Sequence, residues 1–174
     1  MIDLMSMPYE FVIKCILVLF LAGLIGYERE KIHRPAGLRT HLLVGLGALI
    51  MSQASMNIFP DDPARIIAGI VTGIGFLGAG TIFREQDIVR GLTTAASLWA
   101  TSGVAISLAI GEYFVGIFGG LTIYAVLQMK HYKVFHKLFH ESEKAYQKVP
   151  ALANPEKRKK NRMTKKGSSA RKKK

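Results

Sequence analysis

Cysteine is almost absent from this sequence, and its absence limits the chemistry available to the chain. Cys15 is the single cysteine among 174 residues, so a disulfide within the chain and a cysteine-based metal site are both excluded. Because Cys15 lies in an apolar run, we interpret it as a small hydrophobic core residue. A positively charged segment before the first apolar run and an A-x-A-like site after it are also missing, so we expect no cleaved signal peptide.

Acidic residues are missing from the middle of every long apolar run. The acidic residues nearest to these runs lie at their ends: Glu28, Asp62, Glu85, Asp87 and Glu112. Carriers of divalent cations are expected to hold carboxylates near the middle of the membrane, so this absence argues against autonomous Mg²⁺ transport. Among the five histidines only His41 belongs to the apolar part, and no metal, nucleotide or hydrolase motif is found. We therefore expect no cofactor and no enzymatic activity.

Hydrophobic and basic residues are both abundant, but they occupy different parts of the chain. Hydrophobic residues make up 49% of the sequence, and the formal net charge is +12. Residues 130–174 contain 16 Lys or Arg against 3 Asp or Glu, whereas residues 1–129 contain 8 against 9. The chain is therefore predicted to combine a nearly neutral membrane domain, residues 1–130, with a basic extension.

Apolar runs of membrane-spanning length, about 17–25 residues, recur five times. The sequence predicts an all-α membrane bundle of about five transmembrane helices, over residues 11–27, 42–59, 65–83, 93–110 and 113–129. The first and last runs are short, so we expect little tilt. Asp62 is the expected N-cap of the third helix, with Pro63 in its first turn and Arg65 close behind.

The distribution of Lys and Arg between the loops predicts the orientation of the bundle. One side would hold Arg29, Lys31, Arg34, Arg39, Arg84, Arg90 and the basic extension. The other side would hold Arg65, with Lys14 near the start of the first span. We therefore expect the N-terminus outside and the C-terminus in the cytoplasm of a bacterial-type inner membrane.

Charged and hydroxyl side chains gather where the first span ends and where the second and fourth begin. Charges at that depth are costly unless they are paired or hydrated. They form either a salt-bridged helix boundary or a polar edge that binds an ion or a partner. The Pro35–Leu38 turn is expected to direct Arg39 and His41 toward the end of the first span, and Arg39 and Arg84 are expected to pair with Glu28 and Asp87. The residues that we assign to this functional polar edge are Glu28, Arg29, Arg34, Arg39, His41, Arg84, Thr93 and Thr94.

Hydroxyl groups in the fourth span, including Ser97 and Thr101, are expected to bond to carbonyl groups of their own helix rather than to line a polar path.

Glycine is concentrated in the third span. Gly73, Gly75 and Gly78 match the dinucleotide fingerprint G-x-G-x-x-G, but they lie inside an apolar span without the strand and distal acidic residue that the fingerprint requires. Small residues at i,i+4 spacing instead favour close helix packing in lipid. We therefore predict that the third and fourth spans pack tightly through Gly69, Gly73, Gly75, Gly78, Ala79 and Gly80.

The basic extension changes character along its length. Residues 131–149 place aromatic and apolar residues at helical spacing and predict an amphipathic helix on the membrane surface. Residues 150–174 are predicted to be a disordered polybasic tail. Lys157, Arg158, Lys159 and Lys160 within it are expected to contact anionic lipid head groups. Nucleic-acid binding is the less favoured alternative, because interleaved aromatic residues are lacking.

Five motifs in order, GLIGYERE, RPAGLRTHLLVGLGA, DPARI, GIGFLGAGTIFR and VRGLTTAASLW, cover residues 23–99. On these motifs the sequence resembles the MgtC/SapB family of bacterial inner-membrane proteins. The resemblance implies about five spans, a link to growth under magnesium limitation, stress adaptation or survival inside host cells, and in some members inhibition of the ATP synthase. Better-known members carry an ACT-like soluble domain after the membrane part, and the basic extension here is too short to build one.

Two functions from different classes remain open at this point. The favoured one is a non-enzymatic regulator that binds a membrane-protein partner or a second copy of itself. The alternative is a transporter or channel for a small ion.

Overall fold

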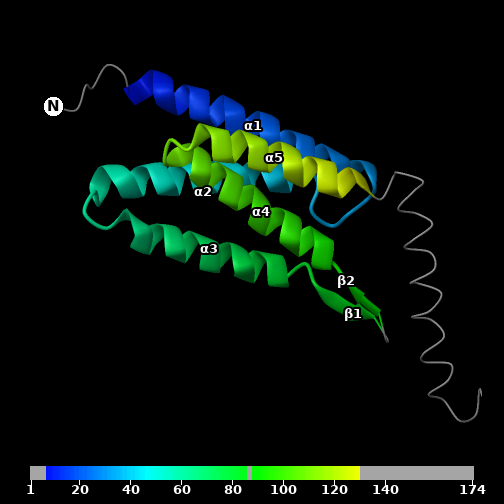
Figure 1. Cartoon of the computed structure of the whole chain (residues 1–174). Coiled ribbons are helices and arrows are strands. Elements are labelled where there is room, and N and C mark those ends of the chain that lie inside the picture. Colours follow the sequence, from blue (N-terminus) through cyan, green and yellow to red (C-terminus); the bar gives the residue numbers. More distant parts are fainter. Residues whose placement is uncertain (1–6, 86–87, 130–174) are drawn as a thin grey trace, which may run out of the picture. The chain divides into compact units, whose positions relative to one another are not determined.

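The computed structural model describes residues 7–85 and 88–129. Within these residues the chain forms five helices and a two-stranded hairpin (Figure 1). The helices and strands are α1 (Met7–Lys31), α2 (Leu38–Ile58), α3 (Pro63–Ala79), β1 (Phe83–Glu85), β2 (Ile88–Arg90), α4 (Leu92–Ala109) and α5 (Tyr113–Gln128). The predicted helical membrane bundle is confirmed. The predicted surface helix at 131–149, the tail at 150–174 and its four lipid-contacting residues lie outside the described residues.

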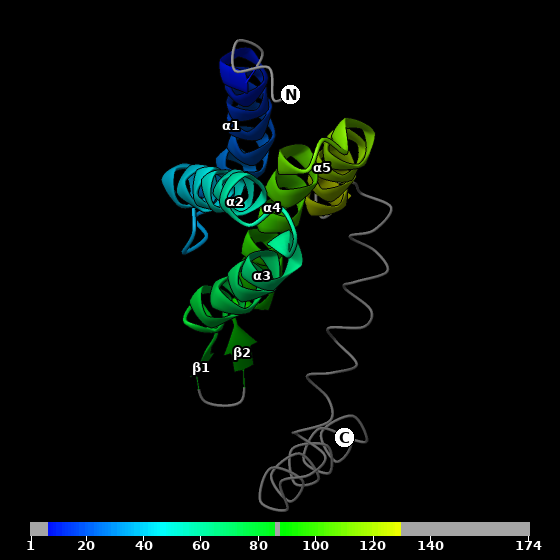
Figure 2. The ribbon, with the colours of Figure 1, turned by 90° about the vertical axis from the view of Figure 1, so that its left-hand side faces the viewer.

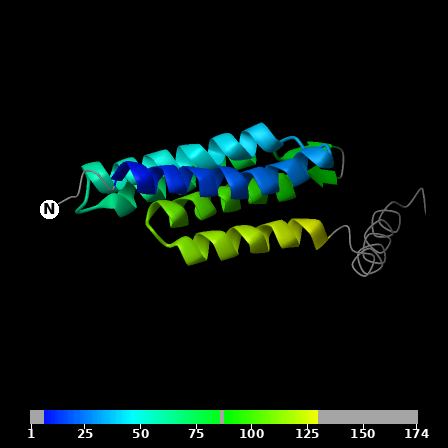
Figure 3. The same cartoon turned by 90° about the horizontal axis from the view of Figure 1, so that it is seen from above.

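The helices run back and forth along one direction, and α4 lies at the centre of the bundle (Figures 2 and 3). Helix α4 contacts all four other helices, whereas α3 packs mainly on α2 and α4. The hydrophobic core gathers around α4 from Val18 and Leu21 of α1, Leu49 of α2, and Leu98 and Leu108 of α4 itself. Side chains on α4 are therefore the ones best shielded from lipid and water.

Three described helices are long and apolar enough to cross a membrane: Tyr9–Lys31, Leu38–Ile58 and Leu92–Ala109. Helices α3 and α5 are apolar but shorter, at 17 and 16 residues. The expectation that the first span is short is wrong, because α1 has 25 residues. It continues through Glu28 and Arg29, whose charges are paired inside the bundle instead of marking a helix end.

The third span ends earlier than predicted, and a hairpin replaces the expected loop. Helix α3 stops at Ala79, and the chain then turns into β1 and β2, which pair antiparallel with Arg84 opposite Val89. Gly91 follows with φ +92°, a conformation in which glycine has no steric cost, and forms the N-cap of α4. The hairpin therefore replaces the last turn of the predicted span.

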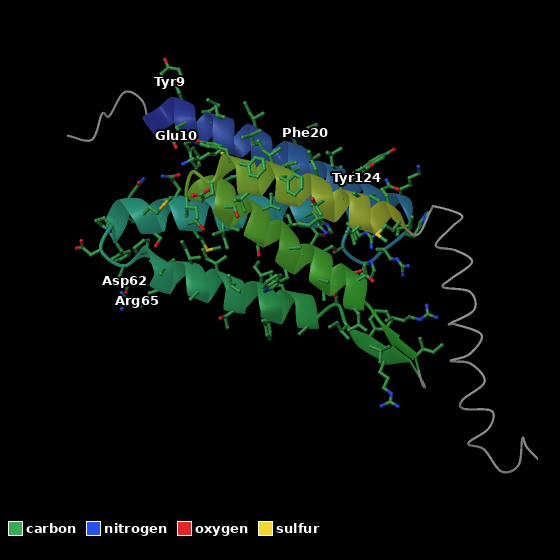
Figure 4. The ribbon with its side chains drawn as sticks, viewed as in Figure 1. Tyr9, Glu10, Phe20, Asp62, Arg65 and Tyr124 are labelled. Atoms are coloured by element: carbon green, nitrogen blue, oxygen red, sulfur yellow. The ribbon has the colours of Figure 1, made fainter. Side chains whose placement is uncertain are left out.

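The two ends of the bundle carry opposite charge. One end is formed by the end of α1, the starts of α2 and α4, and the hairpin. It exposes Lys31, Arg34, Arg39, Arg84 and Arg90, and we call it the basic end. The other end exposes Glu10, Asp61, Asp62 and Glu112, and we call it the acidic end. In Figure 4, Asp62 and Arg65 lie side by side at the acidic end, and Glu10 lies at the same end, apart from them on α1.

Candidate functional site

A group of polar side chains is buried between α1, α2 and α4 near the basic end. It consists of Glu28, Arg29, His41, Thr94 and Ser97, each at most 3% exposed, and we call it the buried cluster. Arg29 donates from Nε to Glu28 Oε2, so the two neighbours form an ion pair inside the bundle. The other carboxylate oxygen, Glu28 Oε1, is buried without a hydrogen-bond partner among the described residues.

A close approach of α1 to α2 closes this cluster. A methyl group on Gly26 would lie 2.8 Å from Cα of Leu38 and 3.0 Å from Cβ of His41. Contacts of that length to backbone leave no room for a side chain, so glycine allows the two helices to meet. His41 therefore lies against the end of the first span, as predicted, whereas Arg39, which was predicted to do the same, is exposed.

The turn between α1 and α2 is held by α1 itself. Glu30 Oε2 accepts a hydrogen bond of 2.8 Å from the backbone N–H of Leu38 and so caps α2, whose own N-cap, Gly37, has no side chain. The backbone N–H of Arg34 donates to the carbonyl of Arg29 at 3.0 Å. These bonds fix the start of α2, and with it His41, relative to α1.

His41 is fully buried and both of its ring nitrogens have partners. Nδ1 lies 2.9 Å from the carbonyl oxygen of Gly37, and Nε2 lies 3.0 Å from Oγ of Ser97 on α4. Ser97 Oγ in turn donates to the carbonyl of Thr94 at 2.8 Å. The imidazole therefore connects the start of α2 to the first turns of the central helix.

The hydroxyl groups of Thr101, Ser102 and Ser107 on α4 bond within their own helix, as predicted. Thr101 donates to the carbonyl of Ser97 at 2.8 Å, and Ser102 donates to that of Trp99 at 2.7 Å. Both are buried. In contrast, Ser52 on α2 is buried with no hydrogen-bond partner for its hydroxyl among the described residues.

The predicted polar edge divides into two parts. Glu28, Arg29, His41 and Thr94 are buried, whereas Arg34, Arg39, Arg84 and Thr93 are exposed. The expected partner of Glu28 was an arginine of another helix, and this expectation is corrected: Glu28 pairs with Arg29, its neighbour on α1. Asp87, the other expected partner, lies outside the described residues.

A second polar group, around Lys14 at the acidic end, was missed. Lys14 is buried inside the bundle, and its ammonium group has three acceptors: Glu10 at 2.7 Å, the carbonyl of Ala109 at 2.8 Å and Gln53 at 3.2 Å. Tyr113 of α5 also donates to Glu10, at 3.1 Å. A cavity of about 310 Å³ opens beside Lys14, lined by Glu10, Phe11, Ile50, Gln53, Ala54 and Asn57. A lysine four positions after a glutamate within an apolar run was the available sequence signal.

The predicted glycine packing between the third and fourth spans is only partly present. Gly78 packs on Ala95 of α4, where an added methyl group would lie 3.4 Å from the alanine Cβ. Gly69, Gly73 and Gly75 have no other atoms within 4 Å of such a methyl group, and Gly80 meets only carbonyls of its own turn. Ala79 is exposed. Within one chain, the prediction that Gly73 and Gly75 contact α4 is therefore wrong.

The residues predicted to begin the third helix do so, with one difference. Asp62 occupies the N-cap position and Pro63 the first turn of α3. The Asp62 side chain makes no cap hydrogen bond; its carboxylate lies 3.7 Å from Arg65 Nε, and both side chains are exposed. An exposed pair of this kind contributes about 0–1 kcal/mol.

No group of three or more His, Cys, Asp or Glu side chains suited to a metal ion occurs among the described residues. The single carboxylate of the buried cluster is already paired with Arg29. The cluster is therefore a hydrogen-bonded group with one internal ion pair.

Comparison with known proteins assigns the chain to a family, because the MgtC family profile matches residues 15–135, well over half of the sequence. The chain belongs to the MgtC family. It is 40% identical to YhiD of Escherichia coli K12, named "Putative magnesium transporter YhiD", over 77% of this chain and 68% of YhiD. It is 46% identical to Protein MgtC of Salmonella typhimurium LT2 over 60% of this chain and 46% of MgtC. The match to Protein MgtC of Brucella abortus is 51% identical over 52% of this chain and 39% of the relative.

These alignments leave more than half of each MgtC relative unmatched. No solved structure matches the chain. Family membership and the three long apolar helices establish a membrane protein.

Proposed function

We propose that this MgtC-family chain is a non-enzymatic protein of the bacterial inner membrane that acts in magnesium homeostasis by binding a partner at its basic end. Family membership and the magnesium in the name of YhiD support the link to magnesium homeostasis. The excess of Lys and Arg at one end of the bundle supports an orientation with that end in the cytoplasm.

The division of the polar edge is the observation that carries the partner-binding proposal. The buried cluster fixes the end of α1 and the start of α2 against α4. Arg34 in the turn between α1 and α2, and Arg39 in the first turn of α2, are both exposed. Guanidinium groups held on a fixed support can bind a carboxylate through two parallel hydrogen bonds. The basic end therefore fits an acidic segment of a membrane-protein partner. The ATP synthase, which the family resemblance implies for some members, and a second copy of this chain are the candidates.

A transporter or channel for a small ion is the second candidate, and one observation favours it. Buried polar side chains occur along most of the length of the bundle, not only in the buried cluster. Beyond that cluster they are Lys14, Ser52, Ser55, Thr101 and Ser102. Ionisable side chains buried at membrane depth, such as Lys14, often mark an ion pathway.

Cross-linking in native membranes tests the partner-binding proposal. A short-range cross-linker attached at position 34 is expected to capture a defined membrane protein, and the same probe at exposed Arg65 of the acidic end is the matched control. Equal capture from both positions, or none from position 34, would contradict the proposal. Ion-specific flux through liposomes containing the purified chain would support the transporter instead.

A further inference from the structure

The cavity beside Lys14 lies between two helices at the acidic end of the bundle, where Figure 4 labels Glu10. Its lining comes from the start of α1 and the end of α2, with Glu10 and Asn57 nearest the helix ends and Lys14 and Ile50 deepest. A helix rises about 1.5 Å per residue, so the deepest lining residues lie only about 10–12 Å from the helix ends. The cavity is therefore at the level where hydrocarbon gives way to head groups.

The ammonium group of Lys14 has no hydrogen left for a ligand. It carries three hydrogens, and three acceptors surround it. These are Glu10 Oε1 at 2.7 Å, the carbonyl oxygen of Ala109 at 2.8 Å and Gln53 Oε1 at 3.2 Å. A simple anion could bind to Lys14 only by displacing one of them. Lys14 therefore orients its neighbours instead of forming an anion site.

The bond from Lys14 sets the direction of two side-chain amides. Because Gln53 accepts from Lys14 through its oxygen, its nitrogen faces away and donates to Asn57 Oδ1 at 3.5 Å. The oxygen of Asn57 is then the acceptor, and its Nδ2 has two hydrogens and no acceptor among the described residues. The side chain of Asn57 is exposed. This side of the cavity therefore presents hydrogen-bond donors.

The opposite side of the cavity presents a carboxylate oxygen. Glu10 uses Oε1 for both Lys14 and the hydroxyl of Tyr113. Its other oxygen, Oε2, makes no hydrogen bond within the described part of the chain, and the side chain is 54% exposed. Glu10 and Lys14 together carry no net charge. The cavity therefore suits a neutral ligand that has a positive group to face Glu10 and an acceptor to face Asn57.

The rest of the lining is apolar. It consists of Phe11, Ile50 and Ala54, and Ile50 is 52% exposed, so the cavity is open toward the lipid along α2. The cavity volume of about 310 Å³ is at the lower end of the range of ligand pockets, which is about 300–1,000 Å³. A head group fits this space, and the attached acyl chains can leave it over Ile50.

We propose that this cavity binds a zwitterionic phospholipid whose head group ends in a primary ammonium, as in phosphatidylethanolamine. The ammonium donates to Glu10 Oε2, the phosphate oxygens accept from Asn57 Nδ2, and the acyl chains lie over Ile50. A choline head group has the same charges but no N–H to donate, and a glycerol head group has no positive charge. The lipid would thereby bridge α1 and α2. The proposal does not depend on partner binding at the basic end.

Native mass spectrometry of the full chain measures which lipid is retained. The purified chain is mixed in detergent with equal amounts of phosphatidylethanolamine, phosphatidylcholine and phosphatidylglycerol that carry the same acyl chains. We expect phosphatidylethanolamine to be retained about fivefold better than either other lipid, because it alone offers a charge-assisted hydrogen bond to Glu10. Equal retention of the three lipids, or a preference for either of the others, would overturn the proposal.

A matched pair of aspartate variants tests the donor side without disturbing Lys14. Asn57→Asp replaces the donors by a carboxylate that repels the phosphate, and we expect retention of phosphatidylethanolamine to fall about tenfold or more. Pro60→Asp adds the same charge to the exposed loop after α2, outside the cavity lining, and is expected to leave retention unchanged. Equal effects of the two variants would contradict the assignment of Asn57.

A pair of glutamine variants tests the carboxylate side. Glu10→Gln is expected to abolish the preference for phosphatidylethanolamine and to favour phosphatidylglycerol, because the charge of Lys14 is then uncompensated. Glu112→Gln removes an exposed charge from the same end, outside the cavity lining, and should keep the original preference. A folded Glu10→Gln protein that keeps this preference would overturn the proposal. If Glu10→Gln does not fold, the three-lipid comparison and the aspartate pair decide it.

Glycerophosphoethanolamine, which has the same head group without acyl chains, distinguishes a lipid from a dissolved ligand. We expect it to displace phosphatidylethanolamine only at a concentration about a hundredfold higher or more, because it lacks the chains that lie over Ile50. Displacement at equal concentration would contradict a lipid site and assign the cavity to a soluble zwitterion.

Discussion

Gly26 of α1 lies so close to Leu38 of α2 that a methyl group on Gly26 would come within 2.8 Å of the Leu38 Cα. The atom in the way is backbone, so it can move only with its helix. Gly23, one turn earlier on the same helix, has ordinary space: the nearest atom to an added methyl group is a terminal carbon of Leu42 at 3.7 Å. The two glycines therefore form a matched pair for measuring how strongly α1 and α2 depend on close approach.

We expect Gly26→Ala to destabilise the bundle by about 1–3 kcal/mol, the usual effect of overpacking. Gly23→Ala is expected to be neutral or slightly stabilising, because alanine is the better helix former. Thermal unfolding in detergent, followed by size-exclusion chromatography, measures both. Equal stability of the two variants would show that α1 and α2 can move apart without lowering the stability of the bundle.

Replacement of Lys14 by Met is expected to destabilise the acidic end. Methionine keeps most of the volume but removes three hydrogen bonds, and it leaves the carbonyl of Ala109 at the end of α4 without its donor. We expect a loss of about 1–3 kcal/mol in the same unfolding assay. Exposed Lys31→Met at the basic end is the control and should change stability little.

Leucine substitutions distinguish the glycines of α3. Gly78→Leu is expected to reduce the amount of protein in the membrane, because Gly78 packs directly on Ala95. Gly73→Leu is expected to leave the amount unchanged, since no other helix of the described residues comes within 4 Å of a methyl group at that position. Immunoblots of membrane fractions measure both. A fall for Gly73→Leu as large as for Gly78→Leu would indicate that this face of α3 packs on another protein chain.

Arg39→Lys tests whether the basic end binds a partner. Lysine keeps the charge but lacks the planar fork of two donors. We expect normal amounts of protein but loss of growth at low magnesium, measured in a strain whose null mutant shows that defect. Arg65→Lys at the acidic end is the control and should grow normally. Full growth of the Arg39→Lys strain would indicate that this arginine only anchors the helix at the membrane surface, a role that any long cationic side chain can fill.

The orientation of the bundle can be measured with reporters fused to the termini. We expect a reporter after Lys174 to be cytoplasmic and one before Met1 to be external, because Lys and Arg favour the cytoplasmic side. Two termini on the same side would contradict five spans.

Hydropathy alone located the five helices, because a segment that crosses lipid must be long and apolar and must make all of its backbone hydrogen bonds within itself. The ends of the helices were harder to predict where polar residues are buried. Glu28 and Arg29 resembled a helix end in sequence, but their pairing lets α1 continue to Lys31. The three-residue strands of the hairpin gave too short a pattern to be recognised.

Four residues of the buried cluster, Glu28, Arg29, His41 and Thr94, were in the predicted polar edge, but Ser97 was not, and the arrangement of the cluster was not predicted. His41 and Ser97 are 56 positions apart, and no local pattern indicates that their side chains meet. Glycine spacing predicted a packing face on α3, but spacing cannot say whether that face meets α4, another chain or lipid. Only Gly78 of the set proved to contact α4.

Lys14 has a consequence for how the protein is made. Its ammonium group depends on Gln53 and Ala109, which are 39 and 95 positions further along the chain. When α1 leaves the ribosome neither residue has yet entered the membrane, and a lysine within a hydrophobic segment is costly in hydrocarbon, about 2.5–3.5 kcal/mol at the centre of a helix. Until α4 arrives, Glu10 one turn earlier is its available partner. We therefore expect the first helix to reach its final depth only after α4 has been inserted, so that the N-terminal helix is among the last to settle.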